Sequence, residues 1–239
     1  MPLRKLTARH RTHAANWQLA SLLAFTAGVV DVSGFLALGQ YTSHMSGLVA
    51  GMAADLHSRG IAAMLHPAIA LGCFVAGAAS CAVMVNWERR RDRESLFAVP
   101  VLLEALLLAS LALPAVHHSI WLALSVLSFS MGLQNAIITK ISDSVIRTTH
   151  ITGMVTDIGI EIGRAFYWNR SPNLLPVTCD STRLGLHSRL VALFFAGGAV
   201  GAFVWPHIGF LLMLPLAALL AAFTILPITA DLRSTVFAR

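Results

Sequence analysis

The sequence predicts an all-α membrane protein with about six transmembrane helices, two short re-entrant half-helices and an inverted 3+3 internal repeat. Three observations lead to this prediction. The composition is strongly apolar, one polar motif occurs twice inside apolar sequence, and lysine and arginine are unevenly distributed among the segments that connect the apolar runs.

The composition indicates a protein that lies in a lipid bilayer. Of 239 residues, 56% are hydrophobic and 12% are charged, and the mean hydropathy is +0.73. Typical soluble domains contain roughly 25% charged residues, so the chain is too apolar for that class. The net charge is +6, and the lysines and arginines that produce it are distributed among the segments that flank and connect the apolar runs. We therefore expect no nucleic-acid partner. Histidine and cysteine lack ligand spacing, so we predict no metal site and no cofactor.

Six apolar runs are each near the roughly 20 residues that cross a bilayer. In chain order they cover residues 17–38, 61–85, 96–113, 120–138, 190–205 and 207–228. A basic tail, residues 1–16, precedes them without a cleavage site, so the first run is expected to be a retained helix and not a signal peptide. Residues 229–239 are expected to form a second tail.

A polar motif divides the chain into two halves. The first copy contains Gly28, Asp31, His44 and Gly47, and the second contains Gly132, Asn135, His150 and Gly153. Corresponding residues are 104 or 106 positions apart, which indicates an internal duplication. We predict a first repeat over residues 17–113 and a second over 114–228, in which a cytoplasmic loop, residues 167–188, is inserted.

The distribution of positive charge predicts how the short motif segments, residues 44–56 and 150–162, lie in the membrane. If both return to the side from which they came, 16 of 17 lysines and arginines are cytoplasmic and only Arg59 is outside. If both cross, the division is 11 against 6. The positive-inside rule therefore favours re-entrant segments, with both termini in the cytoplasm. Three spans in each half then invert the second repeat relative to the first.

The re-entrant segments predict a binding site for a small polar or anionic solute. Their helices would begin deep in the membrane, where unpaired N–H groups and a partial positive charge attract anions. Alternatively, the hydroxyl groups only cap the helices and the glycines only allow close packing. The candidate substrate-binding residues are Ser43, His44, Ser46, Gly47, Thr149, His150, Thr152, Gly153 and Asn135.

Five ionisable residues in or between the apolar runs each have two interpretations. Asp31 and Glu104 lie inside apolar runs, where such residues are costly and usually functional, so either could carry a coupling proton or ion. Asp31 could instead form a structural hydrogen bond to Gln134, Asn135 or the backbone, and Glu104 could be a protonated packing residue. His44 and His150 could switch charge with pH or act only as hydrogen-bond donors. Arg147 could attract an anion or set the topology.

Four stretches of this chain resemble the YoaK-like family of bacterial integral membrane proteins, domain-of-unknown-function family 1275. They are residues 26–39, 44–47, 131–136 and 147–153, and the resemblance extends from about residue 18 to 226. It implies a multi-pass protein of the bacterial inner membrane and supplies no established activity. Relatives typically have Asn where this chain has Leu48, so a ligand held by that Asn in relatives is not implied here.

The sequence therefore predicts a non-enzymatic secondary transporter or permease for a small polar or anionic solute, with proton coupling through Asp31 and Glu104. A second hypothesis is a non-transporting membrane partner that regulates or stabilises another membrane protein through the loop at residues 167–188. A membrane-embedded enzyme is disfavoured, because the polar residues gather at mid-membrane and no catalytic motif is present. The sequence is compatible with a homo-oligomer. It does not identify the solute or the coupling ion.

Overall fold

All secondary structure in the described part of the chain is helical, as predicted. The structure, a computed structural model, describes residues 13–58, 60–91, 96–141, 149–170 and 175–237. Its elements in order are α1 (His13–Leu38), α2 (Met45–Ser58), η2 (Ile61–Met64), α3 (Leu65–Arg90), α4 (Ala98–Ser110), α5 (Pro114–His117), α6 (Ile120–Ile141), α7 (Ile151–Ala165), α8 (Ser181–Ile208), η3 (Gly209–Leu212) and α9 (Met213–Phe237).

Four described segments are long and apolar enough to cross a membrane, compared with the six runs expected. They are Asn16–Leu38, Ile61–Arg90, Ile120–Ile141 and Ser181–Ile225. The last contains α8 and the first half of α9, which are separated at η3, where Gly209 has a positive φ of 55°. The run at residues 96–113 contains α4, whose 13 residues extend only about 20 Å. That length is shorter than the roughly 30 Å hydrocarbon core.

Three helix boundaries differ from the predicted ones. Helix α1 begins at His13 inside the predicted tail, and α9 continues to Phe237 inside the other. Helix α8 begins at Ser181, within the predicted loop 167–188. The side chain of Asp180 accepts hydrogen bonds at 3.0 Å from the backbone N–H groups of Thr182 and Arg183, so it is the N-cap of α8.

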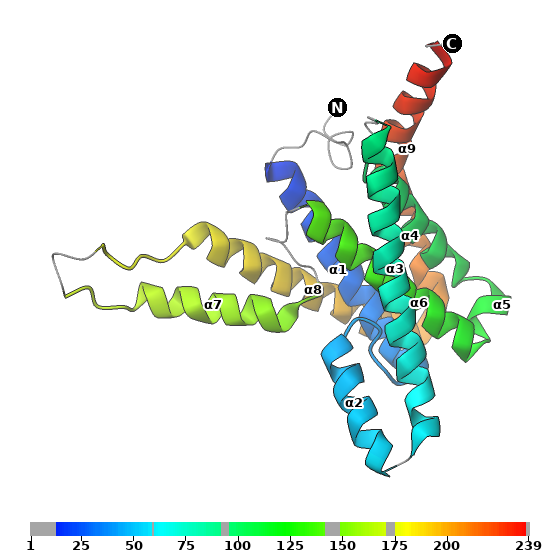
Figure 1. The fold of residues 1–239 in the computed structure, drawn as a ribbon, viewed down its shortest axis with the longest axis horizontal. Helices are drawn as coiled ribbons and strands as arrows, with labels where there is room; N and C mark the ends of the chain where they lie inside the picture. Colours follow the sequence, from blue (N-terminus) through cyan, green and yellow to red (C-terminus); the bar gives the residue numbers. More distant parts are fainter. Residues whose placement is uncertain (1–12, 59, 92–95, 142–148, 171–174, 238–239) are drawn as a thin grey trace.

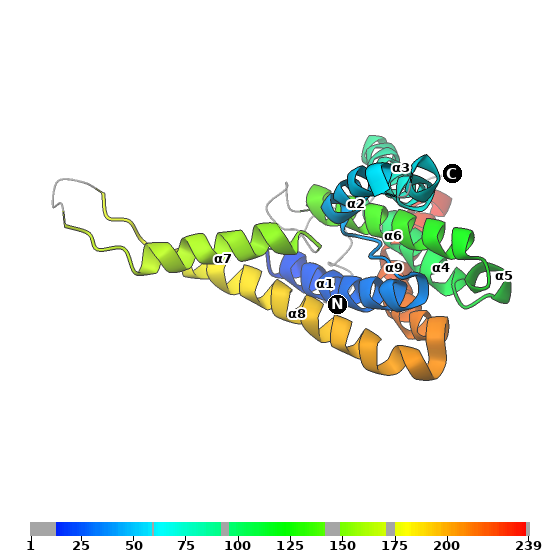
Figure 2. The ribbon, with the colours of Figure 1, turned by 90° about the horizontal axis from the view of Figure 1, so that it is seen from below.

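Helices α1 and α8 cross at unusually close range (Figures 1 and 2). A Cβ atom at Gly28 would collide with the carbonyl oxygen of Phe194. A Cβ atom at Gly197 would collide with the carbonyl oxygen of Phe25. Glycine is therefore required on both helices, because only a residue without a side chain allows two helix backbones to approach so closely.

The same type of contact occurs between α3 and α6. A Cβ atom at Gly77 would meet the carbonyl oxygen of Phe129, and one at Gly132 would meet that of Phe74. Gly132 lies 104 residues after Gly28, and Gly197 lies 120 residues after Gly77. The two helix pairs are thus held by equivalent glycine contacts. A spacing of 104 residues relates the contacts of α1 to those of α6, and a spacing of 120 residues relates those of α3 to those of α8.

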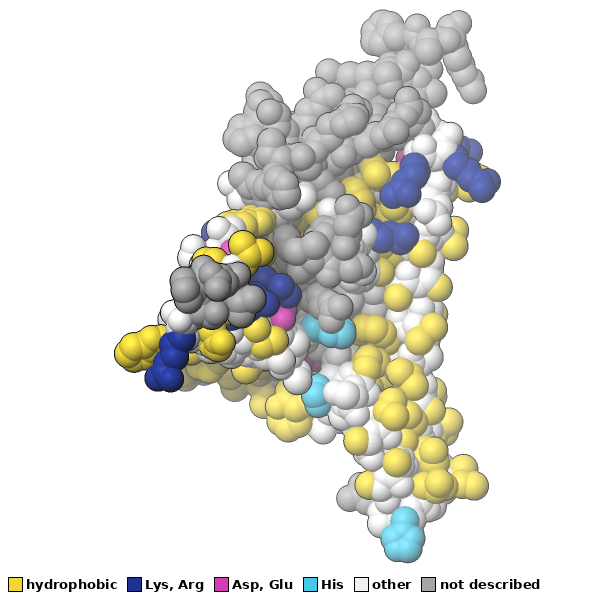
Figure 3. Space-filling model, turned by 60° about the vertical axis from the view of Figure 1, so that its left-hand side comes forward, with side chains coloured by type: hydrophobic (Ala, Val, Ile, Leu, Met, Phe, Trp, Pro, Cys, Tyr) yellow, Lys and Arg dark blue, Asp and Glu magenta, His cyan; other side chains and the backbone are white. Residues whose placement is uncertain are grey.

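The helices differ in how much of their surface is buried. Helix α6 lies at the centre, in contact with α1, α3, α4 and α5, and most of its residues are buried. Helix α3 exposes most of its apolar surface, including Val75, Val83 and Trp87. Hydrophobic side chains cover much of the face in Figure 3. A surface of this kind is suited to contact with lipid.

Replacing Gly77 with alanine should destabilise the protein, because the new methyl group would meet backbone atoms that cannot rotate away. We expect a loss of about 1–3 kcal/mol, which is the usual cost of overpacking, measured as a lower Tm in detergent. Gly72→Ala on the same helix is the control, since nothing lies within 4 Å of its Cβ position. Equal Tm values for the two variants would contradict the close contact.

Candidate functional site

Asp31 holds the chain that follows α1. Its Oδ1 atom accepts hydrogen bonds from the backbone N–H groups of Thr42 at 3.1 Å and Ser43 at 3.0 Å, and from the Thr42 hydroxyl at 3.4 Å. Asp31 precedes the end of α1 at Leu38 by seven residues, or about 10 Å of helix. The chain therefore turns back along α1, and α2 begins beside the interior of that helix.

Asn135 makes a related contact in the second half. Its Oδ1 accepts a hydrogen bond from the Thr149 hydroxyl at 2.5 Å, and its Nδ2 donates to the carbonyl of Met131 at 2.8 Å. Asn135 precedes the end of α6 at Ile141 by six residues, so α7 also begins beside the interior of the helix before it. Arg147 lies outside the described residues.

Gln134, which the sequence left open as a partner of Asp31, has a different partner. Its Nε2 donates a hydrogen bond to the carbonyl oxygen of Leu23, at 2.5 Å. Leu23 belongs to α1 and Gln134 to α6, so this bond joins the two central helices. Among the alternatives for Asp31, the observed contact is the one to backbone groups.

The first turns of α2 and α7 lie near each other in both ribbon views (Figures 1 and 2). His44 and Ser46 at the start of α2 are exposed, as are His150 and Thr152 at the start of α7. The starts of α2 and α7, which carry exposed members of the two predicted sets, thus lie on the same part of the molecule.

Gly47 has a steric role at the start of α2. A Cβ atom at this position would collide with Cδ2 of the His44 imidazole, which therefore packs over Gly47. Ser43, Thr149 and Gly153 are half-buried. Glycine at position 47 lets the histidine ring lie against the helix start, where the unpaired N–H groups are.

Glu104 lies apart from these contacts, in the middle of α4. Its side chain is 0% exposed, and neither carboxylate oxygen has a hydrogen-bond partner among the described residues. A buried charge without a partner is very unfavourable, so such a group is stable in its neutral, protonated form. Asp31 is also buried, at 6% exposure. Unlike that of Glu104, its carboxylate accepts hydrogen bonds from two backbone N–H groups.

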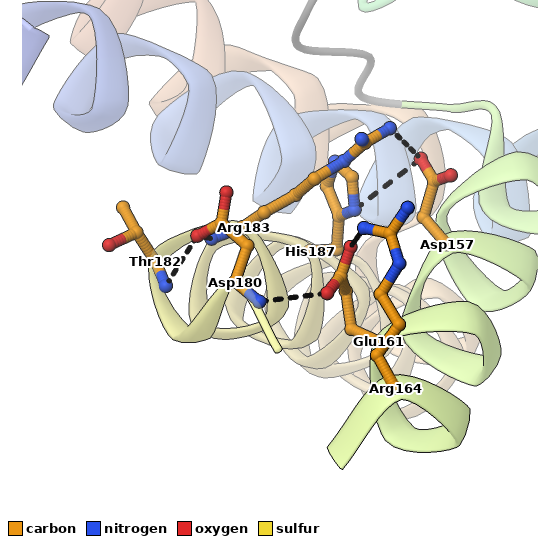
Figure 4. A network of polar contacts seen from close by, with 7 residues as sticks. All are labelled: Asp157, Glu161, Arg164, Asp180, Thr182, Arg183 and His187. Atoms are coloured by element: carbon orange, nitrogen blue, oxygen red, sulfur yellow. Dashed lines mark hydrogen bonds and ion pairs between the residues drawn. The ribbon is translucent and has the colours of Figure 1, made fainter. Parts of the chain in front are cut away.

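A group of charged side chains joins α7 to α8 (Figure 4). We call it the α7–α8 ion-pair cluster, and it consists of Asp157, Glu161, Arg164, Asp180, Arg183 and His187. Oδ2 of Asp157 lies 3.2 Å from an Arg183 guanidinium nitrogen and 3.6 Å from Nδ1 of His187. Protonation of His187 would add a second ion pair to the same carboxylate.

Glu161 is the buried carboxylate of this cluster, at 1% exposure. One of its oxygens is 2.7 Å from Arg164, and the other accepts a hydrogen bond at 2.8 Å from the backbone N–H of Asp180. The sequence analysis did not identify the cluster. Its signal was the four-residue spacing of Asp157 and Glu161 on one helix and of Arg183 and His187 on the next.

The first half has a cavity between α2, α3 and the start of α6. Its volume is about 390 Å³, within the range of small-molecule sites. Gly47 from the predicted site is part of the lining. The complete lining is Leu38, Gln40, Gly47, Leu48, Gly51, Asp55, Ala63, His66, Pro67, Ile120 and Leu124. Leu48 also packs against Ala70 and Leu124.

Within the described ranges, no group of three or more histidine, cysteine or acidic residues could hold a metal ion. Cys73, Cys81 and Cys179 are free thiols. The chemistry that the described site offers is hydrogen bonding from helix N–H groups, hydroxyls and imidazoles.

Comparison with known proteins assigns the chain to a family. Residues 19–226 match the model of a protein family of unknown function, DUF1275. The chain is 26% identical over 193 residues to the UPF0700 transmembrane protein YoaK of Bacillus subtilis (strain 168), an alignment covering 79% of this chain and 83% of that protein. No solved structure matches. With a family match over most of its length and several apolar helices, the chain belongs to the DUF1275 family of membrane proteins.

Proposed function

We propose that this protein is a non-enzymatic secondary transporter or permease of the bacterial inner membrane. A small polar or anionic solute would bind between the starts of α2 and α7. The observation that carries the proposal is that both helices begin beside the interior of a preceding apolar helix and that their starts lie near each other in Figures 1 and 2. Unpaired N–H groups at two such helix starts suit this class of solute.

Repeated contacts support the proposed inverted 3+3 architecture with re-entrant α2 and α7. The glycine-to-carbonyl contacts of the pair α1 and α8 recur in the pair α6 and α3. The anchoring of Ser43 by Asp31 recurs as the anchoring of Thr149 by Asn135. Helices α1 and α6 run in opposite directions in Figures 1 and 2. An inverted repeat would produce all three features.

The proposed orientation has both termini in the cytoplasm. Arginine and lysine side chains visible in Figure 3 gather at the upper end and on the arm formed by α7 and α8. The hairpin of α2 and α3 lies at the lower end of the molecule. This separation agrees with a positive-inside orientation in which the α2–α3 hairpin faces the outside.

The contacts favour different roles for the two intramembrane carboxylates. Asp31 binds two backbone N–H groups, so we assign it to positioning the start of α2. Glu104 is buried without a partner, which suits a group that takes up and releases a proton as the surroundings change. Proton coupling would therefore depend on Glu104.

A second candidate function is a partner for another membrane protein. It is favoured by the exposed aromatic side chains of Phe166, Tyr167 and Trp168, which follow α7. Contiguous exposed apolar residues often mark interaction surfaces. Tyr167 and Trp168 belong to the loop that the sequence suggested as a regulatory surface, residues 167–188, within which α8 begins at Ser181.

A thermal-shift screen of the purified protein against small anions and polar metabolites should find a stabilising ligand. A ligand at 100 times its Kd adds about 2.7 kcal/mol of stability. Gly47→Leu should abolish that shift, because the new side chain displaces His44 from the helix start. The control is Gly159→Leu on α7, where nothing lies within 4 Å of a Cβ. If no compound shifts the wild type and another protein co-purifies through residues 166–180, the partner function replaces this proposal.

Replacing Asp31 separates positioning from proton transfer. The backbone N–H groups of Thr42 and Ser43 both bind Oδ1, which an amide retains, so Asp31→Asn should keep most of the uptake of a ligand found in the screen. Asp31→Leu leaves two N–H groups unpaired, at about 1–3 kcal/mol each, and should lower both Tm and uptake. Loss of uptake in Asp31→Asn with an unchanged Tm would make Asp31 the proton carrier.

Glu104→Gln should abolish the dependence of uptake on a proton gradient while leaving Tm unchanged or higher. Glutamine has nearly the same shape as a protonated glutamate and cannot release a proton. The measurement is solute accumulation in proteoliposomes with and without an imposed pH gradient. Continued gradient-driven accumulation by the variant would exclude Glu104 as the carrier.

A further inference from the structure

We propose that the cavity between α2 and α3 is an access route for the solute, and that the α7–α8 ion-pair cluster is the closed gate of the equivalent route from the other membrane side. This inference rests on the proposed transport function and adds the path and its gate. The proposed conformation is open toward the α2–α3 hairpin and closed toward the arm of α7 and α8.

The cavity and the cluster occupy equivalent positions in the two halves. Asp157 and Glu161 lie 106 residues after Gly51 and Asp55, the spacing that relates His44 to His150. Arg183 and His187 lie 120 residues after Ala63 and Pro67, the spacing that relates Gly77 to Gly197. The four earlier residues all line the cavity, and the four later ones all belong to the ion-pair cluster.

Side-chain size explains why one half is open and the other closed. Nothing lies within 4 Å of a Cβ placed on Gly51, so this face of α2 borders empty space. At the equivalent place on α7, the Asp157 carboxylate reaches Arg183 across the gap between the helices (Figure 4). His187 lies against the same carboxylate and is only 3% exposed. Long charged side chains thus fill the space that glycine and alanine leave free.

The strength of the ion pair suits a gate. The side chains of Arg183 and Asp157 are 50% and 32% exposed, so water screens their attraction and the pair separates at small cost. Glu161 is buried and bonds the backbone N–H of Asp180, so it would keep the start of α8 beside α7 during opening. The Arg183–Asp157 pair can therefore separate while the bond from Asp180 to Glu161 keeps α7 and α8 together.

The cavity also leads to the proposed binding site. Gly47, at the start of α2, is part of its lining, and Gln40 and His66 add polar groups. A volume of about 390 Å³ admits a small polar solute. A molecule entering beside α2 would therefore reach the helix start without crossing the packed centre of the protein.

The route on the α2 side can be tested with single cysteines. In a variant with Cys73, Cys81 and Cys179 replaced by serine or alanine, Gly51→Cys should react with a membrane-impermeant maleimide added outside oriented proteoliposomes. Ala70→Cys is the control, because Ala70 lies nearby on α3 and is 0% exposed. We expect the rate at Gly51→Cys to exceed the control by roughly tenfold or more, since a minor open state is typically populated at or below 10%.

The gate is tested at Met154, which lies on α7 one turn before Asp157 and is 3% exposed. Met154→Cys should react slowly with maleimide added on the cytoplasmic side. Adding Arg183→Gln should raise the rate by roughly tenfold, whereas Arg189→Gln, an exposed arginine on the same helix, should not. The exchange Asp157→Arg with Arg183→Asp should restore slow labelling, which general loosening of the fold would not produce.

Two results would overturn the inference: an unreactive Gly51→Cys, or equal labelling of Met154→Cys with and without Arg183→Gln in variants that elute as the folded protein does. Labelling needs no solute, so it is independent of transport. The expected labelling pattern without uptake of any solute would support the two-sided access path and remove the proposed transport function.

Discussion

The structure depends on how backbone polar groups are satisfied where an apolar helix ends and the chain turns back. In a bilayer, an N–H group without a partner costs several kcal/mol, so a turn inside the hydrocarbon region needs a polar side chain beside it. Asp31 supplies that group for the N–H groups of Thr42 and Ser43, and in the second half Asn135 accepts a hydrogen bond from the Thr149 hydroxyl. These bonds hold the starts of α2 and α7 beside the interior of α1 and α6.

Close helix packing provides the frame in which these turns are held. The glycine contacts at Gly28, Gly77, Gly132 and Gly197 bring backbones together in two helix pairs. Such contacts are rigid, because no side chain lies between the backbones to adjust. The polar contacts of α7 with α8 are partly exposed and therefore weaker. Each glycine pair joins a helix of the first half to a helix of the second, so the centre ties the two halves together and the weaker contacts lie at the α7–α8 periphery.

The failures of prediction have identifiable causes. Residues 181–188 were assigned to a loop because prolines and asparagines precede them, although an aspartate before a serine and a threonine, as at Asp180, is a common helix cap. Four segments of the described chain are long and apolar enough to cross a membrane where six runs were expected, because α4 has only 13 residues and Ser181–Ile225, which contains two of the expected runs, is one apolar segment of 45 residues. The four-residue spacings within α7 and within α8 can be seen in the sequence, but the ion pairs between the helices join residues up to 30 positions apart, so only the fold shows which charges meet.

The sequence by itself determined the helical membrane class, the repeated motif and the starts of α2 and α7 to within a residue, because composition and local spacing set which segments are apolar and where helices begin. It also singled out Asp31 and Glu104, since an ionisable residue is conspicuous in an apolar run. Only the tertiary structure decided that Asp31 is bound by backbone N–H groups while Glu104 has no hydrogen-bond partner among the described residues. The physical reason is that a buried carboxylate is defined by the groups that surround it, and those come from other parts of the chain.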